Sequence, residues 1–281
     1  MTISRLIQKP SDCKSINYKA RKHQHPSTNC QLNNATKTKH PQNLQADKNY
    51  DYYEPLEKKI EKQEPVKYAK SCNDLFKSGK TTTEVYTIDP DGLGAFRVRC
   101  DMETTPGRGW TIFQRRVDGS EDFYRNWTDY KTGFGNFSGE FWLGLDKIHR
   151  LSASGQNVLR VDLETFEDET AYAIYKSFSV GNESEGYILN VGRLPTNVTH
   201  SNAGDSLNLH DGMNFTTKDT EHGECSRTYL GAWWYSGCHE SNLNGFYYLG
   251  HHSSFADGIN LYHWKGFHYS MKKTTMKIKG I

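Results

Sequence analysis

The large aromatic side chains of this chain are confined to one part of it. Every tryptophan and every phenylalanine lies at or beyond Phe76. Burial of such side chains is the main favourable term in folding, so a segment without them has little from which to build a core. Residues 1–70 are therefore predicted to be a polar, basic, disordered N-terminal tail, and residues 71–281 to be the folded part.

The two parts also differ in charge. Residues 1–70 contain 14 Lys and Arg against 7 Asp and Glu, so of the total charge of +2 they carry +7 and the remainder carries 2 − 7 = −5. A basic tail on an acidic domain is one pattern of nucleic-acid binding. The positive charges are scattered, however, and tyrosine is the only aromatic type among them, which favours a solvated linker. We predict no nucleic-acid partner.

Cysteines and glycosylation patterns indicate an extracellular protein. The six cysteines are even in number, and the folded part contains Cys72, Cys100, Cys225 and Cys238. The acceptor pattern for N-glycosylation occurs at Asn34, Asn126, Asn136, Asn182, Asn197 and Asn214. The first ten residues lack the apolar core of a secretory signal, and no apolar run approaches the ~18 residues of a membrane span. We expect a secreted protein whose recorded N-terminus lacks its signal, with no membrane insertion.

Short alternating segments predict a β-rich domain. Residues 83–89 and 95–100 flank the turn cluster "PDGLG" and are expected to form a hairpin. Residues 109–116, 171–178 and 186–191 are expected to add strands to one sheet. Another is predicted at residues 159–165, where Leu159, Val161 and Leu163 alternate with charged residues.

One helix and a long irregular segment complete the pattern. Residues 140–151 predict the clearest helix, with Phe141, Leu145 and Ile148 on one face. From about Ser201 regular periodicity is lost until "TTMKIKG" near the end of the chain. Strands, a helix and a long loop-rich region together favour an α+β domain. Because long irregular segments in compact domains are usually functional, we expect the site after residue 200.

Five segments together resemble the fibrinogen C-terminal domain. They are "GWTIFQRRVDGSEDFYRNWTDYKTGFG", "EFWLGLDKIHRL", "HDGMNFTTKD", "GAWWYSGCHESNLNG" and "YSMKKTTMKI", in the order and roughly the spacing of that family. Within it, the chain looks most similar to the ficolins, tachylectins and tenascins. The resemblance implies a mixed central sheet and three subdomains: an N-terminal hairpin subdomain at 72–110, a central sheet subdomain at 111–200 and a ligand-binding subdomain at 201–281.

The resemblance also implies two disulfides, Cys72–Cys100 and Cys225–Cys238. On the chain-entropy model each would stabilise the domain by roughly 3 kcal/mol. The second would order a segment with little secondary structure, and Trp233 and Trp234 are expected to be buried beside it.

The sequence also offers ligands for two kinds of metal site, one for zinc and one for calcium. Cys225, Cys238, His222 and His239 offer zinc ligands, but an oxidised bridge would remove both thiolates. In the family a loop before the penultimate cysteine binds Ca²⁺ through two aspartates and two carbonyls. Those four positions here are Thr217, Asp219, Glu221 and Gly223. The loop has one certain carboxylate where Ca²⁺ takes six to eight oxygens, so a shortened loop without metal is slightly favoured over a weak calcium site.

The family's acetyl-binding pocket supplies the main functional hypothesis. In ficolin-like members an acetamide enters an aromatic cavity beside the last disulfide. The matching positions are Tyr229, Gly237, Cys238, His239, Phe255, Ala256 and Phe267. Aromatic faces would hold the methyl group, and backbone N–H groups near Cys238 and His239 would bind the carbonyl oxygen.

We therefore expect a secreted, non-enzymatic, lectin-like protein that recognises acetylated carbohydrates such as N-acetylglucosamine, as innate immune lectins do. The alternative is a protein-binding member: a receptor ligand of the angiopoietin type, or an adhesion module of the extracellular matrix, with a cell-surface protein as partner. Cys13 and Cys30 are expected either to pair with each other or to link chains into a homo-oligomer. No motif of a hydrolase, zinc protease or phosphate-binding enzyme is present.

Overall fold

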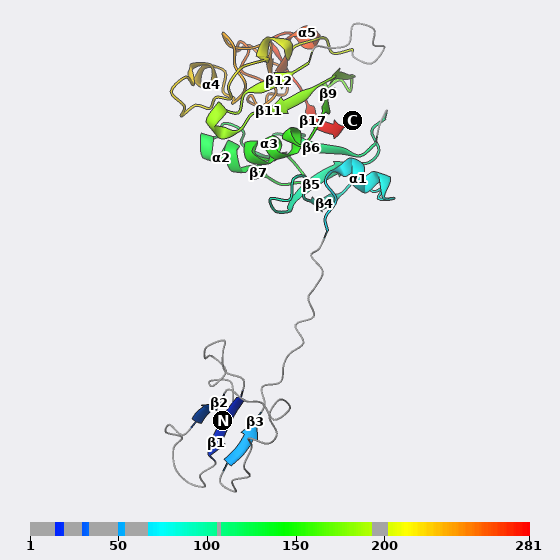
Figure 1. Ribbon diagram of the computed structural model, residues 1–281. Coiled ribbons are helices and arrows are strands. Elements are labelled where there is room, and N and C mark those ends of the chain that lie inside the picture. Colours follow the sequence, from blue (N-terminus) through cyan, green and yellow to red (C-terminus); the bar gives the residue numbers. More distant parts are fainter. Residues whose placement is uncertain (1–14, 20–29, 34–49, 54–66, 106–107, 193–201) are drawn as a thin grey trace. The chain divides into compact units, whose positions relative to one another are not determined.

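The computed structural model (Figure 1) describes residues 15–19, 30–33, 50–53, 67–105, 108–192 and 202–281. The chain divides into two compact units, Met1–Val66 and Lys67–Ile281. In the first unit three antiparallel strands are arranged in the order β2-β1-β3. They are β1 (Ser15–Lys19), β2 (Cys30–Asn33) and β3 (Tyr50–Tyr53).

These strands depart from the prediction of a disordered tail. β1 and β3 coincide with Ile and Tyr residues, types that favour β-structure. The rest of residues 1–66, including Cys13 and the glycosylation candidate Asn34, lies outside the described residues.

The second unit begins at Lys67, slightly before the predicted boundary at residue 71. Ala69 forms a bridge with Ile88, and its carbonyl accepts a hydrogen bond from the Asp89 N–H at 2.9 Å. The backbone just before Cys72 is thereby attached to the edge of the main sheet.

The main sheet has eight strands in the path β10-β9-β17-β6-β5-β4, with β8 pairing β6 and β7 pairing β8. The strands are β4 (Val85–Ile88), β5 (Phe96–Asp101), β6 (Trp110–Arg116), β7 (Phe134–Gly135), β8 (Phe141–Trp142), β9 (Asn157–Glu164), β10 (Thr170–Tyr175) and β17 (Lys273–Gly280). The ladders between these strands are antiparallel, and the parallel Ala69–Ile88 bridge adds the mixed element. The α+β class and the predicted β4–β5 hairpin are confirmed.

The last strand lies in the middle of this sheet. β17 pairs with β9 on one side and β6 on the other, and Met276 and Ile278 are buried. Lys277 is also only 3% exposed, and its ammonium lies 2.6 Å from Asp101 and 2.7 Å from Asp162. The three predicted segments 72–110, 111–200 and 201–281 thus all contribute strands to one sheet rather than forming separate units.

The predicted helix at 140–151 is correct only in its second half. Phe141 lies in β8, and helix α3 (Leu145–Ala153) begins after Gly144. Gly144 has φ +105°, and a Cβ there would lie 2.6 Å from the Thr132 carbonyl. This left-handed residue separates strand from helix, while Leu145 and Ile148 are buried as predicted.

The predicted strand at 186–191 was assigned to the wrong sheet. β12 (Leu189–Val191) pairs with β11 (Phe178–Val180) in a separate two-stranded sheet, whereas the strand at 171–178 is largely β10, which does extend the main sheet. In β9, Leu159, Val161 and Leu163 are buried as the alternation predicted.

Between residue 202 and β17 the chain contains only short elements. They are η4 (Asn208–His210), α4 (Glu224–Thr228), β13 (Ser241–Asn242), β14 (Gly250–His251), β15 (Asn260–Leu261), α5 (Tyr262–Lys265) and β16 (Tyr269–Ser270). The remaining helices precede residue 202 and are α1 (Cys72–Lys77), α2 (Trp127–Thr132) and η3 (Glu183–Glu185). Among the described residues, no helix has the length and apolar character needed to cross a bilayer.

Buried polar side chains of β6 hold this irregular segment against the sheet. The Gln114 amide donates to the Leu243 carbonyl at 2.9 Å, and the Arg116 guanidinium donates to the Gly245 carbonyl at 2.9 Å. Arg116 also lies 3.6 Å from Glu140, and both side chains are almost fully buried. Backbone carbonyls without a partner in regular structure are thereby satisfied, which fixes the segment that follows Cys238.

Candidate functional site

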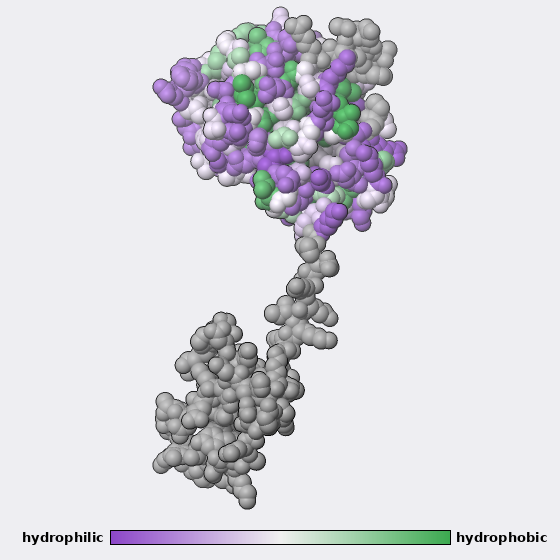
Figure 2. All heavy atoms as spheres, in the orientation of Figure 1, coloured by the Kyte–Doolittle hydropathy of each residue, from purple (hydrophilic) through white to green (hydrophobic). Residues whose placement is uncertain are grey.

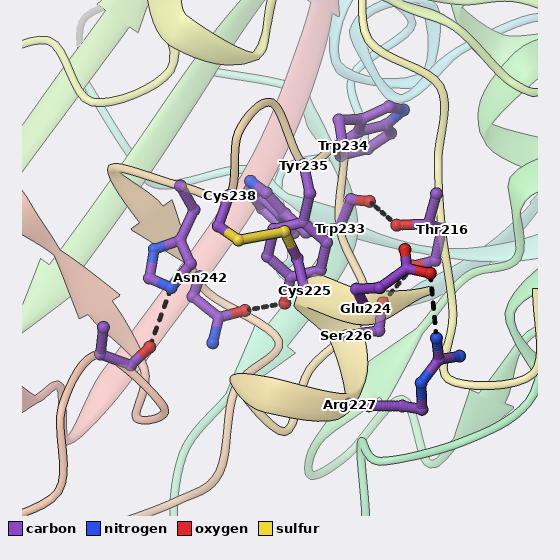
Figure 3. The surroundings of a disulfide bond; sticks show 12 residues. Thr216, Glu224, Cys225, Ser226, Arg227, Trp233, Trp234, Tyr235, Cys238 and Asn242 are labelled. Carbon is purple, nitrogen blue, oxygen red and sulfur yellow. Dashed lines mark hydrogen bonds and ion pairs between the residues drawn. A yellow bond between two sulfur atoms is a disulfide. The ribbon is translucent and has the colours of Figure 1, made fainter. Parts of the chain in front are cut away.

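The C-terminal loops are organised around the Cys225–Cys238 disulfide (Figure 3). Both predicted bridges are present, with Cα–Cα distances of 5.5 Å for Cys72–Cys100 and 5.4 Å for Cys225–Cys238. The second connects α4 to the turn at 236–238, where the Ser236 N–H donates to the Cys238 carbonyl at 2.8 Å. The covalent link fixes this turn, which has no regular ladder of its own. Because both thiols are oxidised, they are not zinc ligands.

Trp233 and Trp234 form the buried support of this turn. Both are fully buried, as predicted, and Figure 3 shows Trp233 next to the disulfide and Trp234 farther from it. Trp233 exchanges two backbone hydrogen bonds with Thr216, and the Trp234 indole N–H donates to the Tyr187 carbonyl at 2.8 Å. Their role in the domain is packing.

Six rings next to the turn form a second group, here called the His239 cluster. Its members are Tyr229, Tyr235, His239, Phe255, Tyr262 and Phe267. The His239 ring centroid lies 4.8 Å from that of Tyr229, 5.7 Å from that of Phe267 and 5.8 Å from that of Tyr235. Phe267 in turn contacts Phe255 at 5.1 Å and stacks on Tyr262 at 4.6 Å.

His239 is the central residue of this cluster. It is 8% exposed, and its Nε2 lies 2.9 Å from the Ala256 carbonyl oxygen. Burial, with a smaller contribution from the nearby His210, lowers the pKa of His239 to about 4. The imidazole is therefore neutral at neutral pH, with Nε2–H donating to the carbonyl.

The adjoining backbone carries unused donors. Within the described part of the domain, neither the Cys238 N–H nor the His239 N–H has a hydrogen-bond acceptor. Cys238 has φ +102° and follows Gly237 at φ +46°, so the turn has a backbone conformation that non-glycine residues seldom adopt. Two peptide donors thus lie at the start of the segment that carries the His239 ring.

The loop that bears Phe255 and Ala256 is held from several sides. Ala256, at φ +64°, donates its N–H to the Phe267 carbonyl at 3.1 Å. The Asp257 carboxylate next to it accepts hydrogen bonds from the Ser254 hydroxyl at 2.7 Å and the Tyr248 hydroxyl at 3.0 Å. Phe255 itself is 57% exposed, so the cluster has one ring open to solvent.

The Asp219 carboxylate in the predicted calcium loop accepts hydrogen bonds from the loop itself and from α2. One Asp219 oxygen accepts from the Trp127 N–H at 3.0 Å and from the Thr217 hydroxyl at 2.5 Å. Glu221 is exposed, and Gly223 precedes α4 with its carbonyl bonded to the Arg227 N–H. Across the residues that the structure describes, no three His, Cys, Asp or Glu side chains form a group suited to a metal ion. The one central carboxylate is thus already hydrogen-bonded through one oxygen, whereas Ca²⁺ takes six to eight oxygen ligands.

Comparison with known proteins identifies the family. The family model of the C-terminal globular domain of fibrinogen beta and gamma chains matches residues 68–281. This chain belongs to the fibrinogen C-terminal domain family.

Curated relatives include ryncolin-4 from Cerberus rynchops, 49% identical over 214 residues, which are 75% of this chain and 61% of the relative. Fibrinogen C domain-containing protein 1-A from Xenopus laevis is 48% identical over 220 residues, covering 75% of this chain and 47% of the relative. The chain thus spans about half to three-fifths of the length of these relatives.

Solved fibrinogen-like structures share the fold. The fibrinogen-like globe domain of human ANGPTL2 is 41% identical with a TM-score of 0.72, and the match covers 75% of this chain and 99% of that structure. Lamprey fibrin D-dimer, solved with the peptide ligand Gly-His-Arg-Pro-amide, is 32% identical with a TM-score of 0.70 and covers 77% of this chain and 74% of that structure.

The fibrinogen C-terminal fold brings six of the seven predicted pocket residues into the His239 cluster or its adjoining turn, and the carbonyl of the seventh, Ala256, accepts the hydrogen bond from His239. Sequence reasoning missed Tyr235 and Tyr262. Tyr262 lies five residues before the predicted Phe267 in the segment "YHWKGF", and this closeness in sequence was its only signal. Tyr235 carried no separate signal, because only the fold turns its ring toward His239.

The glycosylation candidates of this fibrinogen C-terminal domain differ in accessibility. Asn126, Asn136 and Asn214 are exposed. Asn182 is half-buried, and its side-chain oxygen caps η3 by accepting from the Glu185 N–H at 3.2 Å. Asn197 lies outside the described residues.

Proposed function

We propose that this protein is a secreted, non-enzymatic recognition protein that binds acetylated carbohydrates, such as N-acetylglucosamine, at the His239 cluster. The observation that carries the proposal is the pair of unused N–H donors at Cys238 and His239 beside a group of aromatic rings. An acetyl group has the same two parts, a carbonyl oxygen that needs donors and a methyl group that prefers an apolar surface. Membership of the fibrinogen C-terminal domain family supports a recognition role, and the two disulfides support an extracellular location.

The energetics of such a site favour weak binding at each copy. Burial of one methyl group contributes about 0.8 kcal/mol, and few other ligand atoms would be covered. The affinity of a single site should then be on the order of millimolar, and useful retention would come from linked copies. A cross-link between chains through Cys13 or Cys30 would supply them. A band of dimer mass or larger on a non-reducing gel, lost on reduction, is the expected result, and a monomeric band would contradict it.

Chromatography on acetylated resin tests the proposal. The wild-type protein should be retained, free N-acetylglucosamine should elute it, and glucosamine should not. Replacement of His239 or Tyr229 by Ala should abolish retention while circular dichroism shows an unchanged fold. Leu249→Ser is a matched control, because Leu249 is 78% exposed and outside the His239 cluster, and it should be retained like the wild type. Normal retention of folded His239→Ala protein would refute the assignment.

One observation favours a second candidate, binding of a cell-surface or matrix protein. Of the large hydrophobic side chains exposed in the described residues, four fall within 246–262: Phe246, Leu249, Phe255 and Tyr262. The face of the domain drawn in Figure 2 is largely hydrophilic, with separate hydrophobic areas. Exposed apolar groups of this kind mark protein contacts. Loss of cell binding in Leu249→Ser, with retention on acetylated resin unchanged, would support this second function.

A further inference from the structure

The hydrogen bond between His239 and Ala256 determines which imidazole nitrogen carries the proton. A carbonyl oxygen only accepts, so Nε2, at 2.9 Å from the Ala256 oxygen, must be the protonated nitrogen. The Ala256 peptide is itself tied to Phe267 through its N–H at 3.1 Å. A neutral imidazole has one N–H, and Nδ1 of His239 is therefore an acceptor with a free lone pair.

This acceptor has no donor in the described part of the domain. Nδ1 of His239 is buried and makes no hydrogen bond there. The neighbouring ring of Phe267 has no polar atom, and the Tyr235 hydroxyl donates to the Asn242 side-chain oxygen at 2.7 Å. A buried acceptor without a donor costs free energy, which a ligand that brings a donor would recover.

We propose that Nδ1 of His239 makes the site selective for N-acetyl groups over O-acetyl groups. This proposal rests on the proposed acetyl-binding function. An acetamide and an acetate ester share the methyl group and the carbonyl oxygen, so both match the aromatic rings and the backbone donors. Only the acetamide also has an N–H, and it alone satisfies Nδ1. The ester leaves the nitrogen unpaired in a site that has excluded water. A site that forms this hydrogen bond with an acetamide should therefore bind the ester much more weakly.

Entry of the ligand requires one ring to move. Nδ1 is buried away from solvent, and the neighbouring rings of Tyr229 and Phe267 are half-buried beside His239. Phe255 is 57% exposed and contacts Phe267, so its displacement sacrifices the least buried surface among the predicted pocket rings. Movement of Phe255 is therefore the smallest change that would open the His239 cluster to a ligand.

Competition between matched ligands tests the selectivity. The full chain is bound to N-acetyl resin and eluted either with N-acetylglucosamine or with glucose esterified by an O-acetyl group at the same carbon. The ester should require at least about a tenfold higher concentration. Elution at equal concentrations would overturn the selectivity while leaving the acetyl-binding function intact. If neither ligand elutes the protein, the proposed function fails and the selectivity fails with it.

The variant His239→Phe isolates the nitrogen from the ring. It keeps an aromatic side chain and removes the acceptor, so the ratio of the two eluting concentrations should fall to about one. A ratio unchanged from wild type in the folded variant would overturn the proposal, because a purely structural ring would not alter the ratio.

Nuclear magnetic resonance of nitrogen-labelled histidine needs no variant and decides the matter if His239→Phe does not fold or is not retained on the resin. Addition of N-acetylglucosamine should shift the unprotonated Nδ1 resonance of His239 in the direction of a hydrogen-bonded nitrogen. The O-acetyl ester should not shift it in that direction. An equal response to both ligands would overturn the proposal.

Discussion

Acid should destabilise the domain before most of its carboxylates titrate, because two buried histidines are neutral in the fold. Burial lowers the pKa of His210 from 6.5 to about 4, and burial together with His210 does the same for His239. The His210 ring donates from Nδ1 to the Trp234 carbonyl at 2.6 Å, and Nε2 accepts from the N–H groups of Glu240 and Ser241 at 3.4 and 3.3 Å. A proton on Nε2 would oppose those two donors.

The direction and size of the effect follow from the two pKa values. Since the folded values are lowered, the unfolded chain takes up the protons first as the pH falls. The contribution of the two histidines to the free energy of unfolding is fully present above pH 6.5 and decreases between pH 6.5 and about 4. Below about pH 4 it does not decrease further. Between about pH 7 and about pH 4.5 the loss is roughly 2 kcal/mol for each histidine and roughly 4–5 kcal/mol for the pair.

Urea unfolding followed by tryptophan fluorescence, with the disulfides intact, measures this loss at the two pH values. The variant His210→Gln removes one titrating ring, so its acid-induced loss should be smaller than that of wild type by about 2 kcal/mol. His222→Gln is the control, because His222 is exposed and should leave the wild-type dependence unchanged. A wild-type change below about 1 kcal/mol, or an undiminished change in His210→Gln, would refute the reasoning.

Three further outcomes are expected. Replacement of both Cys225 and Cys238 by Ser should lower the free energy of unfolding by about 3 kcal/mol, since the bridge spans 13 residues of sequence, and urea unfolding that matches wild type would contradict this. Burial alone would raise the pKa of Asp101, but Lys277 holds it at about 2, so Asp101→Asn should cost about 2 kcal/mol at neutral pH. That cost should disappear as the pH falls from 3.8 towards 2, and a pH-independent cost would argue against the ion pair. Because the Asp219 carboxylate is already paired, EDTA and Asp219→Asn should each leave retention on acetylated resin within about twofold of wild type, and a loss restored by Ca²⁺ would show that the loop binds metal.

Short-range patterns accounted for much of the fold. Alternation in β9 and the turn cluster between β4 and β5 specified strands because a strand's two faces and a tight turn depend on neighbouring residues. The same rules failed at residues 140–151, where apolar spacing suited a helix throughout. There Gly144 and the pairing of β8 with β6 delay the start of the helix until Leu145. Neither feature can be detected from helical periodicity.

The candidate site was likewise predicted only in part from the sequence. Its residues Tyr229, His239 and Phe267 were found through resemblance of whole segments, since no period links them in the sequence. The resemblance could not specify the proton position on His239, or that the Cys238 N–H and the His239 Nδ1 have no hydrogen-bond partner among the residues that the structure describes. Those properties depend on which distant groups lie within hydrogen-bonding reach, such as the Ala256 carbonyl.

The sequence by itself determined which residues could be buried, which cysteines were available to pair, and where strands and turns could form. The tertiary structure alone decided that β17 lies between β9 and β6, and that Lys277 on it is buried between two carboxylates. It also decided that rings from residues 229 to 267 meet around one imidazole. The reason is physical: local preferences act over a few neighbouring residues, whereas packing and hydrogen-bond partners are set by groups that folding brings together from far along the chain.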